Sequence, residues 1–433
     1  MAMKPLSSNR PFRLIALCSA VYFTSYISRK CYEASILAIC DDTGLTRTAA
    51  GIGGTALVAL YGSGQFVTGW MADRIDPRRI VLAALLLTAA CNAAMPLAVA
   101  TGVASIIAIN GVNGFVQAMF WPPLVKIFAD ELDADRYKGA VFAVNVAANV
   151  AIVAIFALVS GCIRFASWRW SFGFAAASAL ALAAVWGYSH RDAASRHAFR
   201  LESDIRQPGT DSSRQGKSCL RVSATPREDP TSRGMAFLAP VILAIVCIGS
   251  LRDGIEAWAP TIISDLYGLG ASGSTFSVVL LPLFAVGSMA AARVLRRALG
   301  SEIRAALALF AIGFACAAAL LFTSGGPLAA GLPIIALLSA TMHGTNLLLV
   351  GELPGRFAAS GRVGTVSGIL NSGVYLGAAL SIYGFPALRE HFAGWQPVFA
   401  LWAALLLAAL AFCLGAMKLA RPLMPGESSK RMG

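Results

Sequence analysis

Two arginines lie inside long apolar segments of this chain, where a charged side chain is unfavourable. Arg29 is followed four residues later by Glu33, and Arg252 is followed four residues later by Glu256. A guanidinium in hydrocarbon costs roughly 2.5–3.5 kcal/mol on insertion scales, so both arginines must face a polar interior. Because planar guanidinium groups bind oxyanions through paired hydrogen bonds, this pattern suggests a site for an anionic molecule.

The two arginine and glutamate pairs recur at one spacing. Each member of the second pair follows its counterpart by 223 residues, about half of the 433-residue chain. Trp168 and Trp395, which each open a later apolar segment, repeat at a similar spacing. We therefore predict a duplicated unit in which each copy contributes one Arg-x-x-x-Glu step to a shared central site.

The composition is that of a polytopic membrane protein. Hydrophobic residues make up 57% of the chain, charged residues only 13%, and the mean hydropathy is +0.68. Since a helix needs about 20 mostly apolar residues to cross a bilayer, we expect an all-α membrane protein with twelve transmembrane helices in two pseudo-symmetric six-helix bundles. The bundles are predicted at 1–188 and 236–433, with a flexible polar linker at 189–235. The expected helices lie approximately at 13–40, 50–72, 80–100, 103–128, 137–162, 168–188, 236–262, 273–293, 303–323, 327–351, 362–386 and 395–418.

The net charge of +13 comes from basic residues in alternate short connections between the apolar segments. This distribution follows the positive-inside rule and predicts a multi-pass protein of the cell membrane with both termini in the cytoplasm. It argues against nucleic-acid binding. The first apolar segment is too long for a cleavable signal peptide. Nine cysteines without paired spacing give no indication of a disulfide framework, a metal site or a cofactor.

A charged turn follows the second apolar segment and resembles the G-x-x-x-D-R-x-G-R-R signature of the major facilitator superfamily. Its residues are Gly69-Trp70-Met71-Ala72-Asp73-Arg74-Ile75-Asp76-Pro77-Arg78-Arg79. A carboxylate and several arginines in such a turn can form a network that holds one conformation and breaks in the other. We therefore assign a conformational gate to Asp73, Arg74, Arg78 and Arg79. Pro77 stands where the signature has glycine.

Four further segments narrow the resemblance to the organophosphate:phosphate antiporters, the bacterial glycerol-phosphate and hexose-phosphate exchangers. They are Arg29-Lys30, Gln117-Ala-Met-Phe-Trp121-Pro122-Pro123, Asn145-Val-Ala-Ala148-Asn149 and Arg252-Asp-Gly254-Ile-Glu-Ala-Trp258-Ala-Pro260-Thr261. The resemblance implies that Arg29 and Arg252 bind a phosphoryl group from the two halves, assisted by Lys30, and that phosphate is the exchanged counter-substrate.

The chain also departs from these exchangers. Ala148 stands where they carry a histidine, and Gln65 stands where they carry a lysine. The predicted site has three basic residues and three acidic ones, which are Arg29, Lys30 and Arg252, and Glu33, Asp253 and Glu256. A near-neutral site favours a monoanion or a zwitterion over a doubly charged phosphate ester, which the carboxylates would repel.

The two glutamates have two possible roles. At a spacing of four residues, each can form an internal salt bridge with its arginine, Glu33 with Arg29 and Glu256 with Arg252. Alternatively, one glutamate in a dry cavity can carry a proton. His343 is either a substrate donor or proton relay, or a polar link between helices. We predict that further substrate contacts come from Trp121, Tyr26, Asn145, His343 and Asn346, and Tyr22, Tyr32 and Tyr375 could also line the cavity.

The function that these observations favour is secondary active transport of a small organic anion, an organophosphate or phosphonate-like compound, across the bacterial inner membrane by alternating access. Enzymatic chemistry is disfavoured because no Walker-type phosphate loop or metal-ligand cluster occurs. One alternative is a proton-coupled symporter of a carboxylate or zwitterion. Another is a transporter-like sensor of a phosphorylated ligand. The expected partners are the substrate, phosphate or a proton, and the lipid bilayer, with the chain as a monomer.

Overall fold

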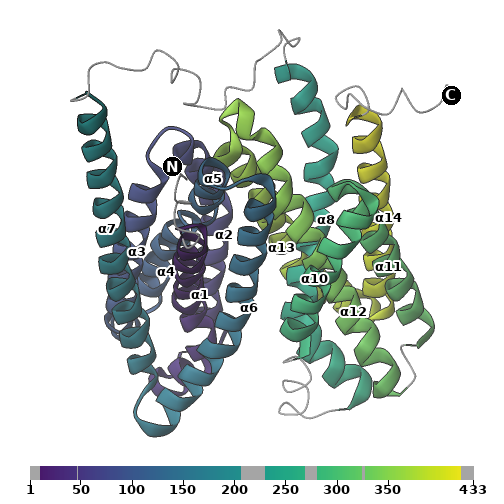
Figure 1. Ribbon diagram of the computed structural model, residues 1–433. Helices are drawn as coiled ribbons and strands as arrows, with labels where there is room; N and C mark the ends of the chain where they lie inside the picture. Colours follow the sequence, from purple (N-terminus) through teal and green to yellow (C-terminus); the bar gives the residue numbers. More distant parts are fainter. Residues whose placement is uncertain (1–9, 46, 206–229, 269–279, 324–326, 421–433) are drawn as a thin grey trace, which may run out of the picture.

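The computed structural model describes residues 10–45, 47–205, 230–268, 280–323 and 327–420, and these residues form helices joined by short turns, without a strand. The helices form two bundles side by side, α1 to α7 and α8 to α14 (Figure 1). This arrangement confirms the predicted fold of twelve transmembrane helices in two halves. The elements are α1 (Arg10–Thr43), α2 (Arg47–Ala72), α3 (Pro77–Thr101), α4 (Val103–Ala118), α5 (Trp121–Glu131), α6 (Ala134–Phe165), α7 (Trp168–Ile205), α8 (Pro230–Tyr267), α10 (Leu280–Leu299), α11 (Glu302–Thr323), α12 (Leu328–Asn346), η1 (Leu347–Glu352), η2 (Leu353–Ser360), α13 (Val363–Phe392) and α14 (Gln396–Ala420).

Two membrane crossings are interrupted helices. The fourth crossing breaks between α4 and α5, where Pro122 and Pro123 lack the N–H groups that a continuous helix would use. Met119 and Phe120 bond instead to carbonyls three residues back, which tightens the chain at the break. The tenth crossing passes from α12 through the π-helical η1 to the 3₁₀-helical η2, which has Pro354 in its first turn.

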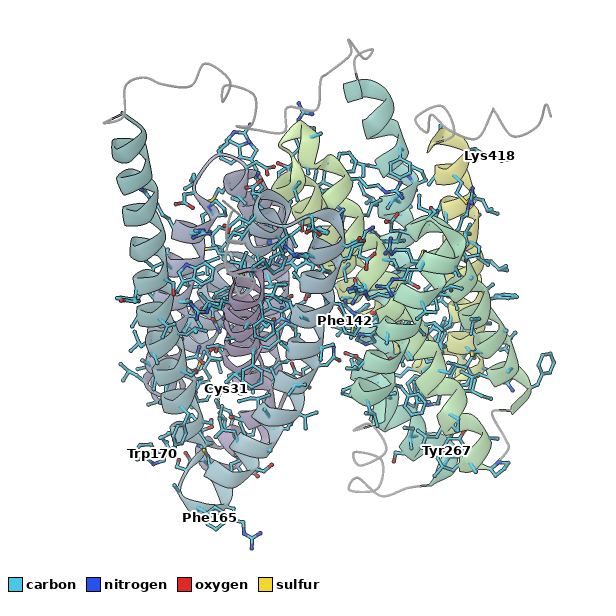
Figure 2. The ribbon with its side chains drawn as sticks, in the orientation of Figure 1. Cys31, Phe142, Phe165, Trp170, Tyr267 and Lys418 are labelled. Carbon is cyan, nitrogen blue, oxygen red and sulfur yellow. The ribbon has the colours of Figure 1, made fainter. Side chains whose placement is uncertain are left out.

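Nine described stretches have the length and hydropathy of a membrane span. The crossings outside this set are α1, α2 and α10, and the first two of these carry polar side chains of the central site. We call the side where α1 begins and α14 ends the terminal side, and the opposite one the far side. At the far side, Phe165 and Trp170 are 83% and 61% exposed, as expected for aromatic rings at a membrane interface (Figure 2).

The duplication predicted from sequence has a matching structural pair at the far side. The indole of Trp168 donates a hydrogen bond to Asp42 at the end of α1, with N···O 3.2 Å. The indole of Trp395 donates to Asp265 near the end of α8, at 3.0 Å. Asp42 and Asp265 are 223 residues apart, the same spacing as the two intramembrane arginines. Each half thus ties its last helix to its first one in the same way.

The interval predicted as a linker, 189–235, begins and ends as helix. Helix α7 continues to Ile205 and α8 starts at Pro230, because the first helix-breaking pair after the sixth crossing is Pro208-Gly209. The remaining part of that prediction, 206–229, lies outside the described residues. So do residues 273–279 of the predicted eighth crossing, and the basic residues Lys4, Lys430 and Arg431 that contribute to the predicted orientation.

Glycines allow α8 and α13 to pack backbone to backbone within the second bundle. A Cβ at Gly249 would stand 1.9 Å from the carbonyl oxygen of Val374, and one at Gly377 would stand 2.0 Å from that of Val246.

We expect Gly249→Ala to destabilise the protein by about 1–3 kcal/mol, since the two helices must separate. Thermal unfolding of the detergent-solubilised protein measures this. Gly415→Ala, which meets no atom within 4 Å, is the control, and an equal melting temperature for both variants would contradict the prediction.

Candidate functional site

A cavity of about 910 Å³ lies between the two bundles and is lined by both. On α1 its lining runs from Tyr26 to Ile36, and on α13 from Tyr375 to Tyr383. On α1 this is the half toward the far side, and on α13 it is the middle of the helix and part of its far-side half. The cavity is therefore built on the far-side half of the molecule, whereas the bundles meet on the terminal side.

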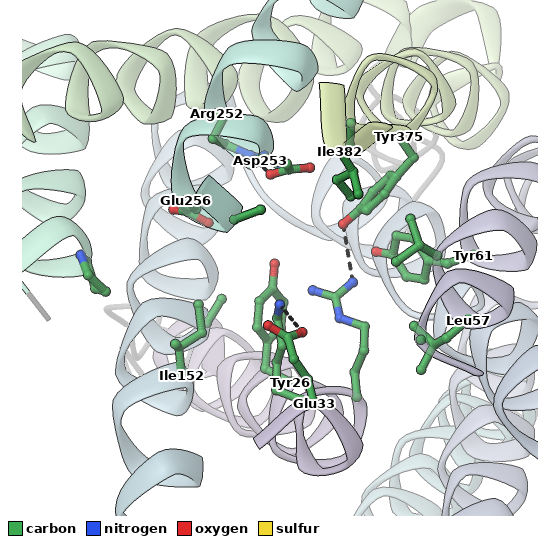
Figure 3. Close-up of a pocket in the computed structure, with 18 of the residues that line it drawn as sticks. Tyr26, Glu33, Leu57, Tyr61, Ile152, Arg252, Asp253, Glu256, Tyr375 and Ile382 are labelled. Carbon is green, nitrogen blue, oxygen red and sulfur yellow. Dashed lines mark hydrogen bonds and ion pairs between the residues drawn. The ribbon is translucent and has the colours of Figure 1, made fainter. Parts of the chain in front are cut away.

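Arg29 extends from α1 into a group of tyrosines. Its guanidinium carbon lies 4.1 Å from the ring centre of Tyr26 and 4.6 Å from that of Tyr61. Its Nη1 donates a hydrogen bond of 3.3 Å to the hydroxyl of Tyr375 on α13, in the other bundle (Figure 3). The tyrosines satisfy the guanidinium without neutralising it. Arg29 is 9% exposed, and no carboxylate forms an ion pair with it among the described residues.

The other two cavity cations are paired with acids. Arg252 donates from Nε and Nη2 to both oxygens of Asp253, at 2.6 and 3.0 Å. Among the described residues Nη1 has no hydrogen-bond partner. Lys30 binds Glu33 at 2.6 Å. The internal salt bridge considered for Glu33 and Arg29 is therefore not the arrangement found, because the guanidinium turns toward aromatic rings on other helices while Glu33 finds Lys30 one turn away.

Glu256 likewise departs from the partner predicted from its spacing. Its Oε1 lies 2.6 Å from Nε2 of His343 on α12, whereas Arg252 of its own helix is bonded to Asp253. The side chain of Glu256 is 35% exposed, and it lines the cavity together with His343. This pair joins two helices across the wall of the cavity, and it holds the one carboxylate of the described cavity lining that has no lysine or arginine partner.

The remaining predicted substrate contacts fall into two groups. Tyr26, Asn145 and Asn346 line the main cavity, and the buried Oδ1 of Asn346 has no hydrogen-bond partner in the described part of the chain. Trp121 is buried against Tyr22, with ring centres 5.4 Å apart, and lines only a small adjoining pocket. It therefore lies behind the wall of the main cavity.

Sequence reasoning missed Tyr61, which completes the ring of tyrosines around Arg29. Helical spacing could have identified it, because Gly54, Val58 and Tyr61 lie on one face of α2 and all three line the cavity. The figure places Tyr61 on the opposite side of the cavity from Glu256 (Figure 3).

Asp73 connects the two bundles on the terminal side. Its two carboxylate oxygens accept hydrogen bonds from the backbone N–H groups of Gly364 and Thr365, at 2.8 and 2.7 Å. These are unpaired donors in the first turn of α13, where a negative charge also complements the helix dipole. Asp73 thus acts as an N-terminal cap for a helix of the other bundle, an interaction that exists only while this side is closed.

The three arginines predicted to act with Asp73 bind within their own bundle. Arg78 forms a hydrogen-bonded ion pair with Glu131, and Arg79 lies 3.7 Å from Asp76. Arg74 stacks on Trp70, with its guanidinium carbon 4.2 Å from the ring centre. Asp76 caps α3, and Pro77 occupies its first position, which explains why proline fits where the signature has glycine.

Close contacts between the bundles accompany the Asp73 cap. The hydroxyl of Tyr137 on α6 donates to the carbonyl of Gly351 in η1, at 2.8 Å. Phe142 of α6 faces the second bundle, where the guanidinium carbon of Arg293 lies 5.0 Å from its ring centre (Figure 2). Gly69 of α2 packs on the backbone of Gly368 in α13. The site is consequently closed on the terminal side.

Comparison with known proteins agrees with this architecture. Residues 18–382 match the Major Facilitator Superfamily. The chain belongs to this superfamily.

Relatives of this facilitator include transporters of phosphorylated and carboxylic compounds. It is 24% identical to the glycerol-3-phosphate transporter of Bacillus subtilis over 385 residues, and this alignment covers 86% of this chain and 85% of that protein. It is 23% identical over 290 residues, 64% of each chain, to a protein of Agrobacterium vitis named for tartrate transport. The resemblance to organophosphate transporters is thereby confirmed.

Solved structures give the same fold at lower identity. The proton:xylose symporter XylE superposes with a TM-score of 0.70 at 13% identity, over 95% of this chain and 96% of that one. The human organic anion transporter MFSD10 gives 0.68 at 16%, over 95% and 100%. The family match and the transporter relatives together show that this facilitator is a multi-pass membrane transporter.

Proposed function

We propose that this facilitator is a secondary active transporter of a small organic anion carrying one net negative charge at its oxyanion group, and that this group binds Arg29. Alternating access of the two bundles would move it across the bacterial inner membrane, with the terminal side in the cytoplasm. The observation that carries the proposal is the unneutralised guanidinium of Arg29 inside a cavity formed by both bundles.

The charge arrangement supports a monoanion. Lys30 is neutralised by Glu33 and Arg252 by Asp253, so one arginine remains to compensate an incoming anion. Nη1 of Arg252 can still donate a hydrogen bond to the same anionic group. A dianion would bring a second negative charge near Glu33, Asp253 and Glu256 without a matching cation, which is costly in a poorly hydrated cavity.

Transport in proteoliposomes tests the substrate charge. We would measure counterflow of glycerol-3-phosphate and lactate into vesicles preloaded with and without phosphate, between about pH 5 and pH 7.5. Because the second pKa of a phosphate monoester is about 6, raising the pH converts it from monoanion to dianion. We expect uptake of the phosphate ester to fall with rising pH while uptake of the carboxylate changes less. Faster ester uptake at high pH would refute the monoanion.

Proton coupling is a second candidate, favoured by the contact of 2.6 Å between Glu256 and His343. A proton bound by this pair would add one positive charge to the cavity and could accompany a monoanion. Its signature is accumulation of the substrate driven by an imposed pH gradient, without a counter-substrate inside the vesicles. Arg29 would bind the anion in both cases.

A further inference from the structure

The cavity carries opposite charges on its two sides. One side is formed by Arg29 and the tyrosines around it, including Tyr61, and this side has a net charge of plus one. Across the cavity from Tyr61 stands Glu256 (Figure 3), where the charged groups around it are Arg252 and Lys30 together with their own partners Asp253 and Glu33. With a neutral imidazole at His343, that side has a net charge of minus one.

We propose that the substrate carries an amine as well as an oxyanion, and that Glu256 binds the ammonium group while Arg29 binds the oxyanion. The class of compound is a small zwitterion such as an aminoalkyl phosphonate or an amino acid. This inference rests on the proposed function, because it deepens the assignment of the same cavity. It accounts for both groups that lack a formal counter-charge, one on each bundle.

The local geometry leaves Glu256 available to an ammonium group. His343 contacts Oε1, and among the described residues no hydrogen bond occupies Oε2. An imidazole that donates from Nε2 would orient the carboxylate without removing its charge. Asn346 lies one helical turn from His343 on α12 and lines the same cavity. Its Oδ1 is a buried acceptor without a hydrogen-bond partner among the described residues, so a small rotation of the side chain would let it accept from the ammonium.

Binding from opposite bundles would also link the substrate to closure. Arg29 belongs to α1 and Glu256 belongs to α8, so a molecule that bears both charges can bridge the bundles. An anion without the amine reaches only one of the two uncompensated groups. A site built for a polar group disfavours analogues that lack it, because its own polar atoms are then left unpaired.

Matched substrate pairs test the inference. We would compare 2-aminoethylphosphonate with ethylphosphonate, and β-alanine with propionate, as substrates and competitors in proteoliposomes of the full-length protein. We expect the wild type to prefer the amine-bearing member of each pair by about tenfold or more. Glu256→Gln should reduce this preference to near unity while uptake of the amine-free member persists, and Glu256→Asp should retain part of it. Glu390→Gln, the same change at an exposed position in the last turn of α13, should keep the wild-type preference.

The contrary outcomes are distinct. Equal transport of both members of each pair by the wild type overturns the amine site and leaves the proposed function intact. A pH gradient that drives the amine-free anion in the wild type but not in Glu256→Gln shows that Glu256 binds a proton, and this also overturns the inference. Absence of saturable, Arg29-dependent uptake for every anion tested refutes the proposed function together with the inference.

Discussion

An Arg29→Gln variant of this facilitator is expected to lose up to about 100-fold of its transport efficiency, because a charge-assisted bond to a buried anion is worth up to about 3 kcal/mol and each 1.4 kcal/mol is a factor of ten. The variant removes the cavity's uncompensated guanidinium while leaving the paired cations in place. Counterflow of the amine-bearing and amine-free anions named above measures the loss. Substrate affinity should fall for both classes alike.

Two further variants separate charge from geometry. Arg29→Lys keeps the charge but offers a single compact donor group instead of a planar fork, so we expect an intermediate loss of about tenfold. Arg164→Gln makes the same chemical change as Arg29→Gln on the exposed far-side end of α6 and serves as the control. Undiminished transport by Arg29→Gln, at equal protein levels, would show that the anion binds elsewhere.

The second large effect is expected from Gly368→Ala, which would hold the terminal side apart. A Cβ at Gly368 would stand 2.3 Å from the backbone carbonyl oxygen of Gln65 in the other bundle. Neither backbone can yield as a flexible side chain would, and overpacking costs roughly 1–3 kcal/mol. Because this cost falls only on the closed terminal side, the variant should shift the balance between conformations by about 10- to 100-fold toward terminal-side opening.

Labelling of an introduced cysteine measures that shift. Ile382 lines the far-side cavity and is 40% exposed, so Ile382→Cys reports access from that side to a membrane-impermeant maleimide. We expect slower labelling and slower transport in the Gly368→Ala background. Gly384→Ala, on the same helix with no atom within 4 Å of its Cβ, is the matched control. Labelling rates that do not differ between the two variants would show that these glycines do not limit closure.

Hydropathy and repeated spacing were sufficient to predict the fold. The apolar segments are long enough to be counted one by one, and the 223-residue repeat divided them into two halves, which the structure confirms. The irregular tenth crossing was not predictable in the same way. Its π-helical residues Leu347–Glu352 include the apolar run Leu-Leu-Leu-Val, which hydropathy cannot distinguish from an ordinary helix.

The partners of the charged residues could not be predicted from spacing along one helix. Residues four apart on a helix are neighbours, so spacing alone pairs Glu256 with Arg252. In the structure Arg252 binds the adjacent Asp253 instead, and Glu256 contacts His343 from α12. Tyr61 and Tyr375 reach Arg29 from two other helices. Such contacts depend on how the bundles pack, and the roles of the cavity residues stay predictions until transport is measured.

The cap that Asp73 forms on α13 affects how readily the two bundles can separate during each transport cycle. Its carboxylate is held by two neutral amide groups and not by an opposing charge. When the bundles separate, water can solvate both the acid and the two amides at the membrane surface, and no second ion has to be exposed alone. A cap of this kind is worth about 0.5–2 kcal/mol. It is strong enough to favour closure and weak enough for thermal motion to release it at every turnover.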